Sequence, residues 1–219
     1  MDTQKIIAEI TQEVKDIMGS EGTGHDWWHI YRELAMAENI GQQEKANMFV
    51  VRLAVLLHDI ADWKFHGGDD TVGPKLAREI LAKYQVAPEV TDKVCEIIEK
   101  LSFKGAGVAS QMPTIEGKVV QDADRLDAMG AIGVARTFAY GGHANRPLYD
   151  PDNQPIMHQT KEDYYKAKSQ GTSLNHFYEK LLLLKDRMNT TTGKKLAQGR
   201  HEFLQTYLDR FFQEWEGKI

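Results

Sequence analysis

A chain of 219 residues is long enough for one large domain or two very small ones. Its 42% share of hydrophobic residues can build a core unaided, and its single cysteine excludes an internal disulfide framework. The formal net charge of −5 argues against a stable complex with nucleic acid, although a small phosphate ester remains possible where a local metal ion outweighs the global charge.

Targeting signals are not evident. Residues 1–20 are periodic and charged, without the continuous apolar core of a signal peptide. No apolar run approaches the roughly 20 residues that cross a bilayer. We therefore expect a cytoplasmic protein with no membrane partner. Cys95 lies in an amphipathic run and is expected to be a buried structural thiol.

Helical periodicity dominates the first two thirds of the chain. Apolar residues recur at three- and four-residue steps from Ile6 to Ile17. Further helices are predicted over 27–40, 45–61, 71–84, 88–103 and most of 119–139. The second of these is nearly all apolar and should be buried. Pro88 suits a first helical turn, where its missing N–H has no intrahelical partner.

The remaining segments are less uniform. Residues 140–159 lose the periodicity and hold three of the six prolines, so we predict a loop that is either a lid over a substrate or disordered. Residues 161–215 read as two long helices joined near 189–193. Because strand alternation is not apparent, we predict an all-α fold. We expect one domain over 1–219, with the motifs within 20–140, the loop at 140–159 and C-terminal helices over 160–217.

The most informative pair is His58-Asp59, directly after an apolar run. An aspartate among leucines is costly to bury unless something compensates it, and a metal ion does so for adjacent His and Asp. On a helix the two side chains point about 100° apart and can still reach one ion. Asp62 would share that face, with His66 one turn further on. Taken alone, the pair is better interpreted as a helix-end charge pair.

Two other segments add weight to this pair. His25 and His29 are four residues apart, which places them on one helix face, although they could be surface histidines. Asp122, Asp124 and Asp127 follow an apolar run. The alternative interpretation of these carboxylates is a solvated, acidic helix start.

Together, His29 in an H-x-x-R context, His58-Asp59, and Asp124 in an A-D-R-L-D context resemble the HD superfamily of metal-dependent phosphohydrolases. Residues 25–29, 58–62, 64–68 and 121–128 are similar to a bacterial subfamily associated with nucleotide pyrophosphohydrolase activity. The resemblance covers about residues 20–190. It implies an HD-type helical bundle, here with a C-terminal pair of long helices, and the metal ligands His29, His58, Asp59 and Asp124.

This ligand set suits one divalent ion, which could be Mn, Mg, Fe, Co, Ni or Zn. No further histidine pair is clearly placed for a second metal, which favours a single ion. Asp62 is the candidate to orient or deprotonate the attacking water, a role the resemblance supports, or else a partner for a histidine ligand. His66 is the second candidate for handling the water.

Cations are needed for the phosphates. Lys64 and Arg125 are catalytic candidates, although Arg125 could simply pair with Asp122 or Asp127. Substrate contacts are expected from four further residues: Lys104, Tyr140, His143 and Arg146. Lys104 lies in a glycine-containing segment that could approach an anion or could be a plain loop.

The expected partner is a small phosphorylated substrate, in the first place a nucleotide, and a homodimer is possible. The subfamily resemblance favours cleavage of a nucleoside triphosphate to monophosphate and pyrophosphate by metal-activated water. Dephosphorylation of a nucleoside monophosphate and hydrolysis of a guanosine alarmone are alternatives. A different class, a regulatory nucleotide-binding protein with a structural metal site, also remains open.

Overall fold

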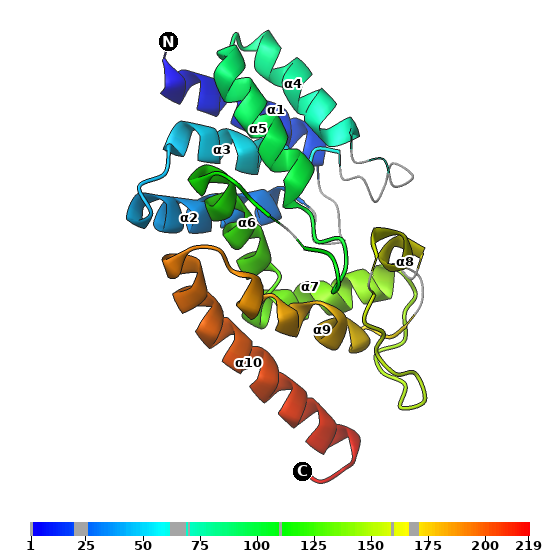
Figure 1. The fold of residues 1–219 in the computed structure, drawn as a ribbon. Helices are drawn as coiled ribbons and strands as arrows, with labels where there is room; N and C mark the ends of the chain where they lie inside the picture. Colours follow the sequence, from blue (N-terminus) through cyan, green and yellow to red (C-terminus); the bar gives the residue numbers. More distant parts are fainter. Residues whose placement is uncertain are drawn as a thin grey trace.

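The structure is a computed structural model that describes residues 2–19, 26–61, 69, 71–109, 111–158, 160–166 and 171–219 (Figure 1). Within these ranges the regular elements are all helices, as predicted. None of the described helices has the length and hydropathy that a bilayer span requires.

The first two helices are set by side-chain caps. Helix α1, Thr3–Met18, begins where the Asp2 carboxylate accepts hydrogen bonds from two backbone N–H groups of its first turn. Helix α2, Trp27–Gln43, begins after Asp26, whose carboxylate accepts from the backbone N–H of His29. This cap fixes His29 within the first turn of α2.

Helix α3, Met48–Leu57, is the most apolar element and is buried along most of its length. Asn47 is the N-cap residue and His58 is the C-cap residue. The helix is therefore shorter than the predicted range 45–61. The Nδ1 atom of His58 lies 2.9 Å from the Val55 carbonyl, one of the terminal carbonyls that lack an intrahelical partner. The prediction that the helix continues through Asp59 was therefore wrong, because Asp59 follows the helix end.

Helices α4, Val72–Lys83, and α5, Pro88–Leu101, pack against each other, and α5 packs on α3. Pro88 occupies the first turn of α5, as predicted. Cys95 is buried, and its thiol donates to the Pro74 carbonyl of α4 over 3.3 Å.

Helix α6, Ile115–Asp127, lies against both α2 and α3 and is buried on most sides. Gly130, with a φ of +67°, lets the chain turn sharply into α7, Gly130–His143. The predicted helix end at 139 was wrong by one turn, because Tyr140 to His143 continue α7.

The C-terminal segment contains one long helix rather than the two predicted over 161–215. Helix α8, Lys161–Lys166, and helix α9, Asn175–Glu179, are short and are followed by 3-10 turns at Leu181–Leu183 and Lys185–Arg187. Gly171, with a φ of +83°, marks a break between the short helices. Helix α10, Thr191–Trp215, packs on α6 and α7 and then projects from the bundle (Figure 1).

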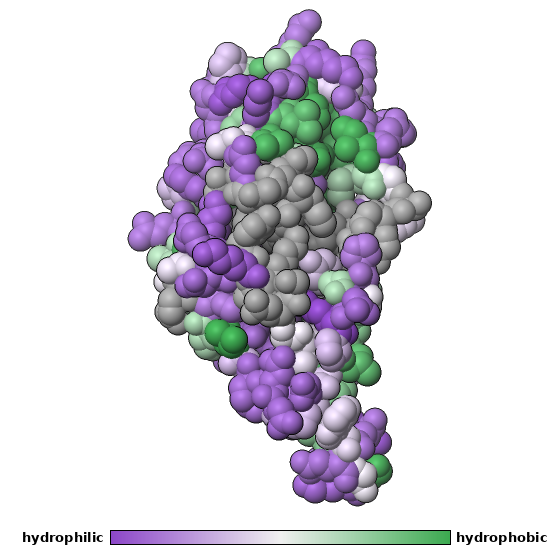
Figure 2. Space-filling model, turned by 90° about the vertical axis from the view of Figure 1, so that its right-hand side faces the viewer, coloured by the Kyte–Doolittle hydropathy of each residue, from purple (hydrophilic) through white to green (hydrophobic). Residues whose placement is uncertain are grey.

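The segment 144–158, predicted to be a lid or disordered, is anchored. The backbone N–H groups of Ser173 and Leu174 donate to the carbonyls of Pro147 and Leu148, at 2.9 and 3.0 Å. The ring of Tyr149 packs edge-on against Phe212 and Trp215 of α10. On the face in Figure 2, hydrophobic side chains gather at the height of α1, α4 and α5, and hydrophilic ones dominate the tapering end.

Candidate metal centre

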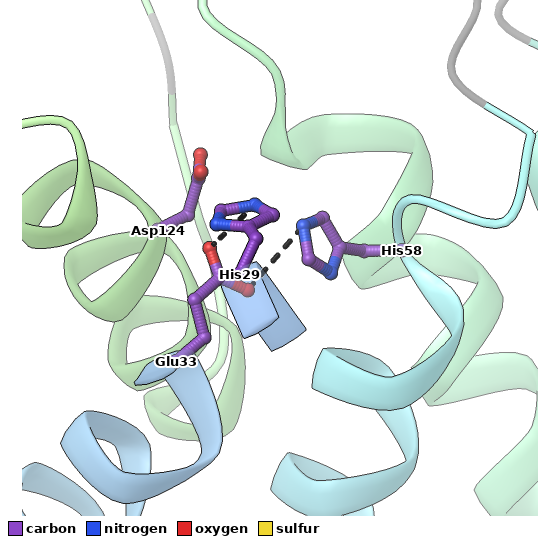
Figure 3. Close-up of side chains that lie close together, drawn as sticks. All are labelled: His29, Glu33, His58 and Asp124. Atoms are coloured by element: carbon purple, nitrogen blue, oxygen red, sulfur yellow. Dashed lines mark ion pairs between the residues drawn. The ribbon is translucent and has the colours of Figure 1, made fainter. Parts of the chain in front are cut away.

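Three helices bring the candidate ligands together. His29 comes from the first turn of α2, His58 from the end of α3 and Asp124 from α6, and their side chains converge on one space (Figure 3). They meet because α2, α3 and α6 pack against one another. Glu33, one turn after His29, joins the group and was not predicted from the sequence. Its spacing of four residues from His29 is the signal that could have found it.

Each histidine is held by its Nδ1 atom. Nδ1 of His29 lies 2.8 Å from Oδ2 of Asp127, and Nδ1 of His58 lies 2.9 Å from the Val55 carbonyl. Both partners are acceptors, so each Nδ1 carries the hydrogen in the neutral ring. The two Nε2 atoms are then left with lone pairs, as metal-binding histidines require.

Both Nε2 atoms face carboxylates. Nε2 of His29 lies 3.3 Å from Oε1 of Glu33, and Nε2 of His58 lies 3.4 Å from Oε2 of the same residue (Figure 3). The Asp59 carboxylate lies at the same space, 3.6 Å from Nε2 of His29 and 4.0 Å from Nε2 of His58. The helix end at His58 thus allows His58 and Asp59 to face one point.

The buried carboxylates of this group repel one another when no cation lies between them. Burial, and then the nearby carboxylates of Asp124, Asp127 and Asp59, raises the pKa of Glu33 well above its usual value. Burial lowers the pKa of His29 and outweighs the hydrogen bond to Asp127, which raises it. Burial opposes ionisation of Asp124, but His58 and His29 outweigh it and lower its pKa.

The arrangement fits a divalent metal ion. One donor atom from each of His29, Glu33, His58 and Asp124 lies within 4.8 Å of all the others. Two donors of one ion are separated by at most about 4.4 Å when each bond is about 2.2 Å long, so a small contraction would suffice. Neither carboxylate oxygen of Glu33 has a hydrogen-bond partner among the described residues. A buried group composed of acceptors is stabilised by a cation.

Asp127 holds the site from behind. Its buried carboxylate accepts hydrogen bonds from Arg32 of α2, at 2.7 and 3.0 Å, and from Arg136 of α7, at 2.8 Å, in addition to its contact with His29. Burial favours the neutral acid, but the bonds from His29 and Arg32 outweigh it, and the pKa of Asp127 lies well below its usual value.

Asp122 forms its hydrogen bonds away from the candidate metal centre. Its carboxylate accepts from the backbone N–H groups of Asn189 and Thr190, each at 2.8 Å, and from the Thr190 hydroxyl at 2.7 Å. A side chain at Gly193 would overlap this carboxylate. Asp122 therefore fixes the start of α10, whereas Asp124 faces the candidate metal centre.

Arg125, which was predicted to be catalytic, has surroundings that do not favour that role. Its guanidinium is buried and donates to the Arg187 carbonyl, and burial lowers its pKa to about 10. Arg187 in turn donates to the carbonyls of Gly105, Ala106 and Val108. Arg125 thus supports the segment that carries Lys104, which lies just after α5.

Tyr140, His143 and Arg146 form a cluster of their own at the end of α7. The rings of Tyr140 and His143 are 6.5 Å apart, and the Arg146 guanidinium lies 5.5 Å from the Tyr140 ring centre. A helical rise of 1.5 Å per residue puts Tyr140 about 15 Å along α7 from Gly130. The cluster thus lies at the end of α7 that is farther along the chain from α6, the helix that carries Asp124.

Four predicted residues lie outside the described ranges: His25, Asp62, Lys64 and His66. A further cation, Lys180, was not predicted. Its charge helps to lower the pKa of Asp124, and its Nζ lies 5.6 Å from the Phe103 ring centre. Lys180 follows α9, and nothing in the local sequence distinguishes it from other lysines.

Similarity to known proteins shows that the chain belongs to the HD superfamily of hydrolases. A sequence profile described as "HD domain" matches residues 27–129. The chain is 36% identical to the Bacillus subtilis protein YpgQ over 99% of its own length and 97% of that of YpgQ.

Solved structures show the same relationship. A Lactobacillus plantarum protein superposes with a TM-score of 0.87 at 34% identity, covering 99% of this chain and 100% of the other. An HD-superfamily hydrolase from Bacillus thuringiensis superposes with a TM-score of 0.74 at 41% identity, covering 98% of each chain. YpgQ in complex with ADP superposes with a TM-score of 0.73 at 36% identity, covering 95% of this chain and 97% of YpgQ.

Proposed function

We propose that this protein is a metal-dependent phosphohydrolase that cleaves a nucleoside triphosphate to a monophosphate and pyrophosphate. The observation that carries the proposal is the buried group of acceptors around His29 and His58, whose Nε2 atoms face carboxylates at 3.3–3.6 Å. Membership of the HD superfamily supports hydrolase chemistry. The ADP complex of YpgQ supports a nucleotide as the ligand.

One divalent ion would be held by His29, His58, Asp59 and Asp124. When bound, such an ion lowers the pKa of water, polarises phosphorus and offsets the charge that develops during hydrolysis. Asp127 and the Val55 carbonyl keep the two imidazoles in the tautomer that can bind it. Asp62 is proposed to orient or deprotonate the attacking water, with His66 as the second candidate, and Lys64 is proposed as a cation for the phosphates.

Substrate binding is proposed to use cations around the centre. Lys180 is the first candidate, because its charge helps to lower the pKa of Asp124. Lys104 lies beside Phe103, the ring that Lys180 approaches. Tyr140, His143 and Arg146 would contact the base or sugar of an extended nucleotide. Arg125 is reassigned to support of the Arg187 segment, because its buried guanidinium already donates to the Arg187 carbonyl.

Metal analysis combined with turnover of a nucleotide panel tests the proposal. We expect about one metal ion per chain after reconstitution with Mn²⁺, Co²⁺ or Ni²⁺, and pyrophosphate as the product from a triphosphate. Release of orthophosphate from a monophosphate would indicate a phosphatase instead of a pyrophosphohydrolase. Turnover of an alarmone alone would indicate that the alarmone is the substrate. Nucleotide binding without turnover under any metal would indicate the regulatory alternative. Failure of every metal to bind would refute the site.

A further inference from the structure

Glu33 occupies a position in the metal centre that the H…HD…D pattern does not include. It lies on α2, one turn after His29, and its side chain is fully buried. Its two oxygens divide between the two histidines: Oε1 lies 3.3 Å from Nε2 of His29, and Oε2 lies 3.4 Å from Nε2 of His58. The carboxylate therefore spans the ligands contributed by two different helices (Figure 3).

The contacts between the Glu33 oxygens and the two Nε2 atoms are not explained as hydrogen bonds. Because Nδ1 of each histidine faces an acceptor, the facing Nε2 atoms carry lone pairs in the neutral rings. Lone pairs at 3.3–3.4 Å from carboxylate oxygens are not hydrogen-bonded, and neither Glu33 oxygen has another partner among the described residues. Burying an ionised carboxylate beside Asp59 and Asp124 costs several kcal/mol, which either a proton on Glu33 or a cation between these groups would offset. A single proton could bond only one of the two Nε2 atoms that the Glu33 oxygens face, whereas a cation would bind both.

We infer that Glu33 binds the divalent ion directly, as a third carboxylate ligand, and biases the centre toward cations that prefer oxygen. The inference rests on the metal site of the proposed function. With Asp59, Asp124 and Glu33, the centre offers three carboxylates to two imidazoles. Carboxylate ligands suit Mg²⁺ and Mn²⁺, whereas imidazole suits Zn²⁺ and Ni²⁺. Removing Glu33 should therefore weaken Mn²⁺ binding more than Zn²⁺ binding.

The test compares metal-depleted full-length wild type with Glu33→Gln, which keeps the shape and removes the charge. Glu38→Gln is the matched control, because Glu38 lies on the same helix and pairs with Arg52 away from the centre. Calorimetric titration should show Mn²⁺ affinity reduced by at least about tenfold in Glu33→Gln, with a smaller loss for Zn²⁺. Glu38→Gln should bind both ions as the wild type does.

A second measurement reports on coordination itself. The visible absorption spectrum of the Co²⁺-loaded protein responds to the number and type of ligands, so Glu33→Gln should shift or intensify it relative to wild type. Unchanged affinities for both ions together with an unchanged Co²⁺ spectrum would overturn the inference. An equal loss of affinity for both ions would refute the proposed selectivity.

Folding of the variant provides an independent check. If Glu33 is a metal ligand, Glu33→Gln removes repulsion between carboxylates, and the metal-free variant should melt at or above the wild-type temperature. A lower melting temperature with unchanged metal affinity would mean that Glu33 serves only as an ion-pair partner of the histidines. Should Glu33→Gln fail to fold, Glu33→Asp, which keeps the charge but withdraws the carboxylate, should show the same loss of Mn²⁺ preference; wild-type preference would refute the inference.

These results are separable from the proposed activity. Wild type that binds Mn²⁺ and loses its preference on Glu33→Gln, but hydrolyses no nucleotide, would remove the function and leave this inference standing. Nucleotide hydrolysis by wild type with no effect of Glu33→Gln on metal binding would do the reverse.

Discussion

The Nδ1 atom of His29 lies 2.8 Å from Oδ2 of Asp127, and this contact joins residues 98 positions apart in the chain. The same carboxylate accepts hydrogen bonds from Arg32 and Arg136, so it links α2, α6 and α7. Asp127 does not face the candidate metal centre, yet it decides which nitrogen of His29 does. It is therefore a positioning residue, and its loss should be measurable as loss of metal.

Asp127→Asn should weaken metal binding by about 10–100-fold, the usual cost of removing a residue that orients a metal ligand. The amide can donate to Nδ1 of His29 and so favour the wrong tautomer. Titration of the metal-depleted variant with Mn²⁺ measures the effect, with Glu38→Gln as a control. Wild-type affinity in Asp127→Asn would show that His29 is oriented by packing alone.

The stability contributed by Asp127 should depend on pH in a defined direction. Its pKa is depressed in the folded protein, so its contribution is complete above the unfolded value of about 3.9 and is lost as pH falls below it. The difference in free energy of unfolding between metal-free wild type and Asp127→Asn should therefore be largest near pH 7 and shrink toward pH 3. Urea unfolding at a series of pH values tests this, and a constant difference would contradict it.

Asp122 and Asp124 should separate stability from metal binding. Asp124→Asn should abolish or strongly weaken metal binding, because its carboxylate lies with His29 and His58. Asp122→Asn should keep metal affinity but destabilise the protein by about 1–3 kcal/mol, because it weakens the bonds to Asn189 and Thr190. Metal titration and thermal melting of both variants give the comparison. The reverse pattern would exchange the two assignments.

Asp62→Asn should lower turnover of the best nucleotide by about 10²–10⁴-fold while leaving bound metal and melting temperature nearly unchanged. The change removes a basic carboxylate and keeps its shape. Activity within a few-fold of wild type would mean that Asp62 does not act on the water. Loss of metal along with activity would instead place Asp62 among the groups that hold the ion, and His66 would become the candidate base.

Lys180→Met should reduce kcat/KM for the nucleotide by about tenfold or more, because a hydrogen bond to a charged group contributes about 1.5–3 kcal/mol. Lys194→Met is the matched control, since Lys194 is exposed on α10. Steady-state kinetics should show the change mainly in KM if Lys180 binds a phosphate equally before and during reaction. Equal kinetics for the two variants would remove Lys180 from the substrate site.

The sequence predicted most of the helices that carry the centre, because apolar spacing and caps are local signals. The order of the H…HD…D motif predicted that His29, His58 and Asp124 lie together, as they do in the structure. Helix ends were less predictable: α3 stops at Leu57 because His58 bonds back to Val55, a contact made by a side chain. Glu33 was missed although its spacing of four residues from His29 is a local signal. Lys180 was missed because its relation to the centre is its charge on Asp124, which is distant in the chain. The two long C-terminal helices were overpredicted, since 3-10 turns share apolar spacing with α-helix.

The wide separation of His29, His58 and Asp124 along the chain has a kinetic consequence. Joining positions 29 and 124 in an unfolded chain closes a loop of about 95 residues, at an entropic cost of about 4 kcal/mol. An ion cannot recover that cost until α2, α3 and α6 have already packed around their apolar faces. The metal should thus bind after the folding transition state, so it should slow the unfolding of this protein while leaving its rate of folding almost unaltered.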